Sequence, residues 1–253
     1  MREEKYDQLK VKVYGSRREM GQAAAADVAA AIGQILAEKE ECNMIFAAAP
    51  SQNEMLEALR ENRNIPWERV RAFHMDEYCG LDPKASQCFG NFLDRTLFMQ
   101  VNMRARYYLR EAGKTPEEIC RNYSDLLRQY PVDIVCLGIG ENGHIAFNDP
   151  PVADFKDAEL VKLVKLDEVC RMQQVHDGCF ASIDQVPVCA VTLTIPALCA
   201  ARYMFCVVPA ATKARAVRAA CTGPVEESCP ASVLRRHPGA ALYLDPDSSS
   251  LLE

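Results

Sequence analysis

Residues 133–151, DIVCLGIGENGHIAFNDPP, decide the fold of this chain. The stretch opens with a short apolar run, which is typical of a strand buried on both faces of a parallel sheet. A glycine-rich loop follows at once, and parallel sheets bind ligands at the carboxyl ends of their strands. We therefore predict an α/β fold with a ligand site at residues 138–149.

The segments on either side alternate between strand-like and helical patterns. The predicted strands are 10–13, 43–48, 70–75, 106–109, 190–195, 203–208 and 240–244. The predicted helices are 17–38, a short helix capped by Ser51, 91–98, 116–128 and 212–221. This alternation indicates a doubly wound, Rossmann-like, mostly parallel sheet with helices on both faces. We expect one domain over residues 1–253, with the polar tail after residue 244 marking the end of the ordered fold.

Composition excludes several classes of partner. The 253 residues, 49% of them hydrophobic, suffice for one large core. The net charge is −6 and the basic residues are scattered, which argues against nucleic-acid binding. No apolar run approaches the roughly 20 residues that span a bilayer, and none follows the N-terminus as in a secretory signal. We expect a cytoplasmic protein that binds neither membrane nor nucleic acid.

The twelve cysteines raise the question of disulfides or metal. They form no C-x-x-C pair and no cluster with histidine at zinc-ligand spacing. Several, such as Cys136 and Cys206, lie in apolar runs, where a thiol behaves as a small hydrophobic group. We expect reduced structural thiols and no metal.

The glycine loop matches G-x-G-x-x-G, so a dinucleotide site has to be considered. Pro150 and Pro151 limit any following helix to about two turns, and the loop lies mid-chain, which disfavours that interpretation. The loop also carries His144 and, five residues later, Asp149. Imidazole suits proton transfer near neutral pH, and a carboxylate can fix its tautomer. A structural histidine is the alternative, but the loop's position at a strand end favours catalysis.

Two further features suggest chemistry. Asp76 and Glu77 end the predicted strand 70–75, and two adjacent carboxylates are costly to bury without a task. Spacing does not decide between them, and an exposed acidic turn is the alternative. Lys213 lies in the first turn of a predicted helix, where its charge opposes the helix dipole. A bound phosphate would remove this conflict, whereas a solvated lysine would need no ligand.

The residues between 150 and 187 have the least regular pattern. In an α/β enzyme such a segment can form a lid over the site. A surface excursion without a role is the alternative, and the sequence leaves both open.

Together these segments resemble the glucosamine-6-phosphate deaminase family, within a wider group that includes the 6-phosphogluconolactonases. The resemblance rests on MDEY at 75–78, GL at 80–81, GHIAFN at 143–148, DQVP at 184–187, TKA at 212–214 and HP at 237–238. It implies an enzyme that converts a 2-amino sugar phosphate to fructose 6-phosphate and ammonia. It also implies that no cofactor or metal is needed and that the chain forms a homo-oligomer.

The resemblance assigns roles to individual residues. Asp76 would move a proton between C2 and C1, and His144 would protonate the ring oxygen as the sugar opens. Asp149 would support His144, although the family usually has glutamate there. Asn142, two residues before the histidine, would also belong to the catalytic residues, at a position where the family usually has aspartate. Lys213 would hold the phosphate. The other residues expected to bind substrate are Ser51, Glu77, Gly140, Gly143 and Arg171.

The chain departs from the family at the phosphate. The family's T-G-G-T loop is replaced by residues 48–51, AAPS, of which Ser51 keeps a hydroxyl. The family's lid arginine aligns with Cys179, which leaves Arg171 as its substitute.

Two other functions remain open. A lactonase would share the fold and the histidine loop, but the residues 75–78 and 146–148 favour the deaminase. A non-catalytic sugar-phosphate sensor would usually carry a DNA-binding extension, and we find no helix-turn-helix pattern.

Overall fold

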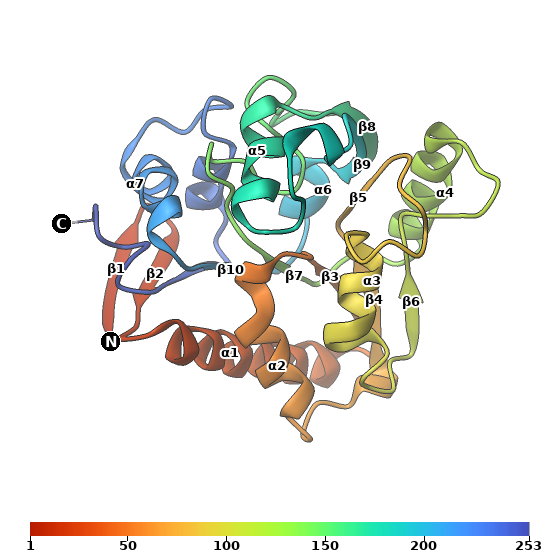
Figure 1. The fold of residues 1–253 in the computed structure, drawn as a ribbon. Coiled ribbons are helices and arrows are strands. Elements are labelled where there is room, and N and C mark those ends of the chain that lie inside the picture. The colour runs from red at the N-terminus through yellow and green to blue at the C-terminus, as the bar shows by residue number, and fades with distance from the viewer. Residues whose placement is uncertain (253) are drawn as a thin grey trace.

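A computed structural model describes residues 1–252 and contains a long central sheet (Figure 1). Its strands are β1 (Arg2–Tyr6), β2 (Leu9–Val13), β3 (Cys42–Phe46), β4 (Val70–His74), β6 (Ala105–Tyr107), β7 (Ile134–Leu137), β10 (Tyr203–Val208) and β11 (Ala240–Leu244). Their order across the sheet is β1-β2-β11-β10-β7-β3-β4-β6. Every neighbouring pair is parallel except β1 with β2. The predicted doubly wound, mostly parallel sheet is confirmed.

Helices cover both faces of this sheet because its strands alternate apolar side chains between two cores. One face carries α1 (Arg17–Glu38), α2 (Asn53–Glu61), α3 (Phe89–Leu93) and the π-helix η3 (Asp94–Phe98). The other carries α4 (Pro116–Gln129), α6 (Ile195–Cys199), α7 (Ala214–Thr222) and the 3-10 helix η6 (Pro230–Arg236). Three further 3-10 turns are η1 (Pro50–Gln52), η2 (Trp67–Arg69) and η5 (Ala211–Lys213).

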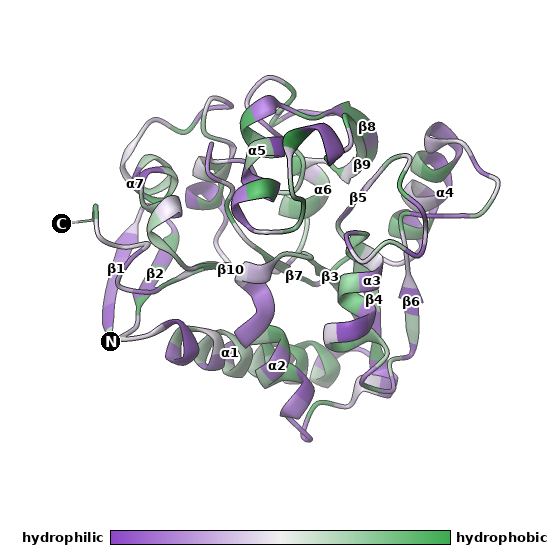
Figure 2. Cartoon of the chain, in the orientation of Figure 1, coloured by the Kyte–Doolittle hydropathy of each residue, from purple (hydrophilic) through white to green (hydrophobic). Residues whose placement is uncertain are grey.

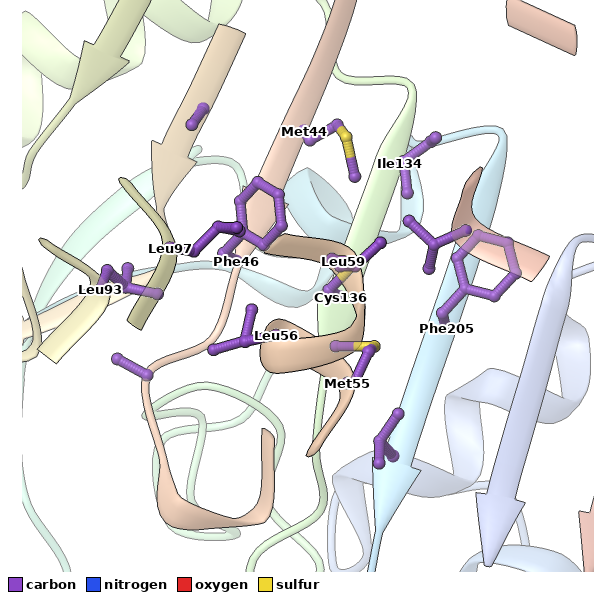
Figure 3. Close-up of a cluster of buried hydrophobic side chains, with 14 of the residues drawn as sticks. Met44, Phe46, Met55, Leu56, Leu59, Leu93, Leu97, Ile134, Cys136 and Phe205 are labelled. Atoms are coloured by element: carbon purple, nitrogen blue, oxygen red, sulfur yellow. The ribbon is translucent and has the colours of Figure 1, made fainter. Parts of the chain in front are cut away.

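The core beneath α2 illustrates this packing (Figure 3). Met55 and Leu56 of α2 belong to one buried cluster with Phe46 of β3, Cys136 of β7 and Phe205 of β10. Burying a side chain of this size contributes roughly 1.5–3 kcal/mol. The cluster therefore fixes α2, and the loop before it, against the carboxyl ends of three strands.

Helix α1 is long and apolar enough to cross a membrane by length and composition, contrary to the expectation that no segment would be. Here it is a core helix, since Met20, Val28 and Ile32 are fully buried against the fold. Gly21 permits its close contact with α2, because a Cβ there would lie 2.5 Å from the Cβ of Glu54.

The irregular segment 150–187 forms β8 (Val161–Lys165), α5 (Glu168–His176) and the 3-10 turn η4 (Ile183–Gln185). Strand β8 pairs with β9 (Cys189–Leu193), which pairs in turn with β5 (Asp76–Tyr78). The described residues thus hold a second, three-stranded antiparallel sheet that the sequence did not predict. Its middle strand joins residues that are distant in the sequence.

Three local expectations were wrong. Strand β1 was not predicted because it is polar along its length, as Figure 2 shows. Ser51 does not cap a helix: it lies within η1, after Pro50, and α2 starts two residues later. The tail after residue 244 is ordered up to residue 252, since Ser248 is fully buried and its N–H donates to Asp245.

Candidate active site

A cavity opens at the carboxyl ends of β3, β7 and β10, and residues of α5 also line it. Its walls bring together Ser51, Asp76, His144 and Lys213, which come from four separate segments of the chain. Strand ends meet at one edge of a parallel sheet, which is why segments distant in the sequence reach one cavity.

Asp76 begins β5 and lines the cavity with only 7% of its surface exposed. Burial, and then the neighbouring charge of Glu77, raise the pKa of Asp76 to about 8. A carboxyl group with such a pKa can both accept and return a proton near neutral pH.

Glu77 lies outside the cavity lining of the described chain, so the cavity lends no support to the expectation that it binds substrate, which stays a prediction. Its carboxylate accepts three backbone N–H bonds of 3.0 Å, from Tyr78, Phe89 and Gly90. These bonds fix the loop between β5 and α3. Glu77 therefore positions Asp76 and contributes its negative charge.

Strand β9 connects the Asp76 motif to the histidine loop. Thr192 lies directly opposite Asp76 in the small sheet, and its Oγ1 accepts a 3.0 Å hydrogen bond from the Phe147 N–H. The Asn148 side chain donates to the Leu193 carbonyl at 2.9 Å. Sequence reasoning missed Thr192 because nothing in its own segment signals this pairing.

The glycines of the loop leave space for the side chain of His144. A Cβ at Gly140 would lie 2.1 Å from Cε1 of His144, so the imidazole packs where only glycine fits. Gly143 has φ +85°, and a Cβ there would meet the Cys229 sulfur at 2.9 Å. Gly140 lines the cavity and Gly143 does not, so the structure supports a positioning role for Gly143 and no substrate contact.

His144, Asp149 and Asn142 form a closed triangle. The His144 Nδ1 lies 2.9 Å from Asp149 Oδ1 and 2.7 Å from Asn142 Oδ1. The Asn142 amide donates to Asp149 Oδ1 at 3.0 Å. Two oxygens facing Nδ1 hold a proton on that nitrogen, which leaves Nε2 to exchange a proton with a ligand.

Asp149 is the buried anchor of this triangle. Burial alone would raise its pKa, but the hydrogen bond and charge of His144 and the Asn142 amide bring the pKa of Asp149 below its usual value. Its carboxylate is therefore ionised at neutral pH and can stabilise an imidazolium.

The Cys170 thiol from α5 lies beside this pair. Donor atoms of His144, Asp149 and Cys170 fall within 4.8 Å of one another, close enough to hold a metal ion. Metal binding needs a thiolate, however, and burial raises the pKa of Cys170 well above its usual value. The donor set thus fits a metal poorly, and a metal-free site stays a prediction.

The opposite end of the cavity is cationic. Lys213 is 5% exposed and lines the cavity, and its Nζ has no hydrogen-bond partner within residues 1–252. It lies at the end of η5, just before α7, close to the helix start that the sequence predicted. Burial lowers the pKa of Lys213, so an anion bound there would stabilise its charged form.

The turn before Lys213 has an unusual backbone. Ala210 has φ +82° and ψ 146°, a region that residues other than glycine rarely adopt. Its N–H donates to the two carboxylate oxygens of Asp245 at 3.2 and 3.1 Å. Asp245, just after β11, therefore holds the turn that presents Lys213.

Helix α5 contributes amides to the cavity, and the expected arginine does not reach it. Arg171 donates to the carbonyls of Ile183 and Val186 at 2.7 and 2.9 Å, and it lies outside the cavity lining. These carbonyls occupy its guanidinium, so the structure lends no support to the expectation that Arg171 binds substrate, which stays a prediction. Gln174 lines the cavity from the same helix, whereas Cys179 does not.

Comparison with known proteins identifies the family of this chain. Residues 15–243 match the family described as glucosamine-6-phosphate isomerases/6-phosphogluconolactonase. The glucosamine-6-phosphate deaminase of Exiguobacterium sibiricum is 31% identical over 219 residues, which cover 87% of this chain and 84% of that protein. The glucosamine-6-phosphate deaminase of Bacillus cereus strain G9842 is 30% identical over 87% of this chain and 82% of its own length.

Solved structures share the fold. A monomeric glucosamine-6-phosphate deaminase superposes with a TM-score of 0.85 at 26% identity, covering 95% of this chain and 99% of that one. The 6-phosphogluconolactonase of Thermotoga maritima superposes with a TM-score of 0.75 at 19% identity, over 93% and 98% of the two chains, which shows the fold alone. The chain belongs to the glucosamine-6-phosphate isomerase and 6-phosphogluconolactonase family.

Proposed function

We propose that this enzyme is a glucosamine-6-phosphate deaminase, which converts glucosamine 6-phosphate and water to fructose 6-phosphate and ammonia. The observation that carries the proposal is one cavity that holds a carboxyl group of raised pKa, a histidine–carboxylate pair and a buried lysine. The identity to deaminases over most of the chain supports the same branch of the family.

Ring opening falls to His144. Its Nε2 delivers a proton to the ring oxygen as the bond between that oxygen and C1 breaks. The C1 hydroxyl loses a proton to solvent as it becomes the aldehyde, so the proton count of the sugar is unchanged. The negative charge of Asp149, 2.9 Å from Nδ1, stabilises the imidazolium before transfer.

Isomerisation falls to Asp76. Its carboxylate removes the proton from C2 while the C1 oxygen takes up a proton from solvent, which gives an enol bearing the nitrogen. The carboxyl group then returns its proton to C1. Water adds to the resulting imine at C2, and ammonia leaves to give the ketone. The raised pKa of Asp76 makes it a stronger base than an exposed aspartate.

Three further statements belong to the proposal. Helix α5 is the lid: it lies over the cavity, and the Gln173 side chain accepts a 2.8 Å hydrogen bond from the Glu141 N–H of the glycine loop. The protein works in the cytoplasm, as a metabolic enzyme of this family would. Assembly into a homo-oligomer stays a prediction, which light scattering of the purified protein tests.

The deciding experiment measures ammonia release from glucosamine 6-phosphate, with and without exhaustive chelation. We expect turnover that chelation leaves undiminished. Hydrolysis of 6-phosphogluconolactone without ammonia release from any amino-sugar phosphate would move the protein to the lactonase branch. Binding without either reaction would make it a sensor.

A further inference from the structure

Arg17 is a cation at the cavity that neither the sequence pattern nor the family motifs single out. It is the first residue of α1, and it lines the same cavity as Ser51 and Lys213. Arg17 and Lys213 are the two lysine or arginine side chains that line this cavity within residues 1–252.

The guanidinium of Arg17 is held against the loop that replaces the family's phosphate loop. Its Nη2 donates to the carbonyl of Pro50, and its Nε lies 2.7 Å from Oε1 of Glu54. A guanidinium carries five N–H donors, so these contacts orient the group and leave donors for a ligand.

This places Arg17 at the Lys213 end of the cavity. Pro50 precedes Ser51, whose Oγ accepts a 3.0 Å hydrogen bond from the Gln52 side chain. The same Gln52 nitrogen donates to the carbonyl of Val207 at 3.1 Å, on the strand that leads to Lys213. The loop after β3 and the turn after β10 are therefore adjacent, with Arg17 beside the first and Lys213 in the second.

A sugar phosphate needs more positive charge than Lys213 supplies. A phosphate monoester carries about two negative charges near neutral pH. Helix α5 adds the Gln173 and Gln174 amides at the cavity and no cation, since Arg171 is held by backbone carbonyls. Asp177, at the end of this helix, adds a carboxylate. A guanidinium can bind two phosphate oxygens at once, which fixes orientation as well as charge.

We propose that Arg17 is the second cationic ligand of the substrate phosphate and selects phosphorylated over unphosphorylated sugars. The inference rests on the proposed function, because it takes a sugar phosphate as the ligand. It assigns to the start of α1 a role that the family pattern gives to a lid arginine.

Calorimetric titration with fructose 6-phosphate, inorganic phosphate and fructose tests the proposal on the full chain. We expect Arg17→Gln to weaken the binding of fructose 6-phosphate and of inorganic phosphate by a similar factor, about tenfold, and to leave the binding of fructose unchanged. Arg18→Gln is the matched control, since Arg18 is the exposed neighbour outside the cavity lining, and it should bind as wild type does.

Glu54→Gln separates ligand contact from helix packing. It removes the same ion pair but keeps the guanidinium, so it should retain binding. Equal binding by Arg17→Gln and wild type overturns the proposal, and so does a tenfold loss in Glu54→Gln. If wild-type protein binds neither fructose 6-phosphate nor inorganic phosphate, the proposed function fails first, and the role of Arg17 fails with it.

Discussion

The two ends of the cavity differ in how their polar groups are satisfied. At the catalytic end, His144, Asn142 and Asp149 bond to one another, and Glu77 accepts three backbone N–H groups. At the phosphate end, the buried Nζ of Lys213 has no partner among the residues described. Under the proposed function, the protein thus assembles its proton-transfer groups in advance and leaves the anion site for the substrate to complete.

The catalytic end should be the more sensitive to a single change. Asp76→Asn should lower kcat about 10⁴-fold, because an amide cannot accept the C2 proton. Exchange of the C2 proton with solvent measures the step directly. Asp177→Asn is a control, since Asp177 also lines the cavity but has no proposed part in the chemistry, and it should exchange normally. Substantial exchange by Asp76→Asn would remove Asp76 from the role of base.

Substitutions in the triangle around His144 should have the next largest effect on catalysis. Asp149→Asn should lower kcat/KM about 10³-fold, because it removes the charge that supports the imidazolium. Asn142→Asp should lower kcat/KM only about tenfold. This substitution removes the hydrogen bond that the Asn142 amide donates to Asp149, and it places a second carboxylate beside that residue. Steady-state kinetics of both variants measure the ranking. A harmless Asp149→Asn would mean that the pair does not perform ring opening.

The pKa of Asp76 predicts the shape of the pH profile. Burial and the charge of Glu77 raise it to about 8, so the basic form is gained as pH rises. At pH 6 about 1% of Asp76 would be ionised, and kcat/KM should be about a hundredfold below its plateau. Glu77→Gln should move this acidic limb to lower pH. Comparing Glu77→Gln with the wild type cancels the effect of substrate ionisation on the profile, because both proteins use the same substrate. Coincident acidic limbs would contradict the electrostatic role of Glu77.

Substitutions at the phosphate end should change substrate affinity more than turnover. Lys213→Ala should raise KM about fiftyfold with a smaller change in kcat, because a charged contact to the phosphate is lost. Arg171→Gln should leave KM within about twofold, since the Arg171 guanidinium serves two carbonyls away from the cavity. An unchanged KM in Lys213→Ala would show that the phosphate binds elsewhere.

The smallest effect should come from the turn beside Lys213. Ala210 at φ +82° is in a region that favours glycine, so Ala210→Gly should raise the free energy of unfolding by about 1 kcal/mol. Urea denaturation measures it, with Ala211→Gly in the adjacent 3-10 turn as the control that should destabilise. A destabilised Ala210→Gly would show that the turn carries no strain.

Sequence patterns predicted the parts of this molecule that depend on local periodicity. Helix 17–38 and strands 203–208 and 240–244 agree with the structure at both ends, because apolar spacing defines them. The rule that strand ends carry ligands singled out Asp76 and His144, and the conflict of Lys213 with the helix dipole singled out Lys213; all three line one cavity. Contacts that form only in the folded chain could not be predicted from local sequence patterns. The carbonyls that occupy Arg171 belong to Ile183 in η4 and to Val186 just after it, and both follow α5 after a loop.

The position of Arg17 shows the same limit. In the sequence it is an ordinary first residue of a long, apolar helix, and only packing of α1 beside α2 brings it to the loop at Pro50. The small sheet is equally non-local, since Asp76 pairs with Thr192 across more than a hundred residues. No window of sequence contains both partners.

That pairing has a consequence for how the protein refolds. Asp76 and the histidine loop reach their places only when β9 has joined β5 and accepted the N–H of Phe147. Closing such long loops costs entropy before the new contacts offset it, so the strand pairing forms late. After dilution from denaturant, helical circular dichroism should recover before catalysis does, and the lag between the two signals would time the docking of β9.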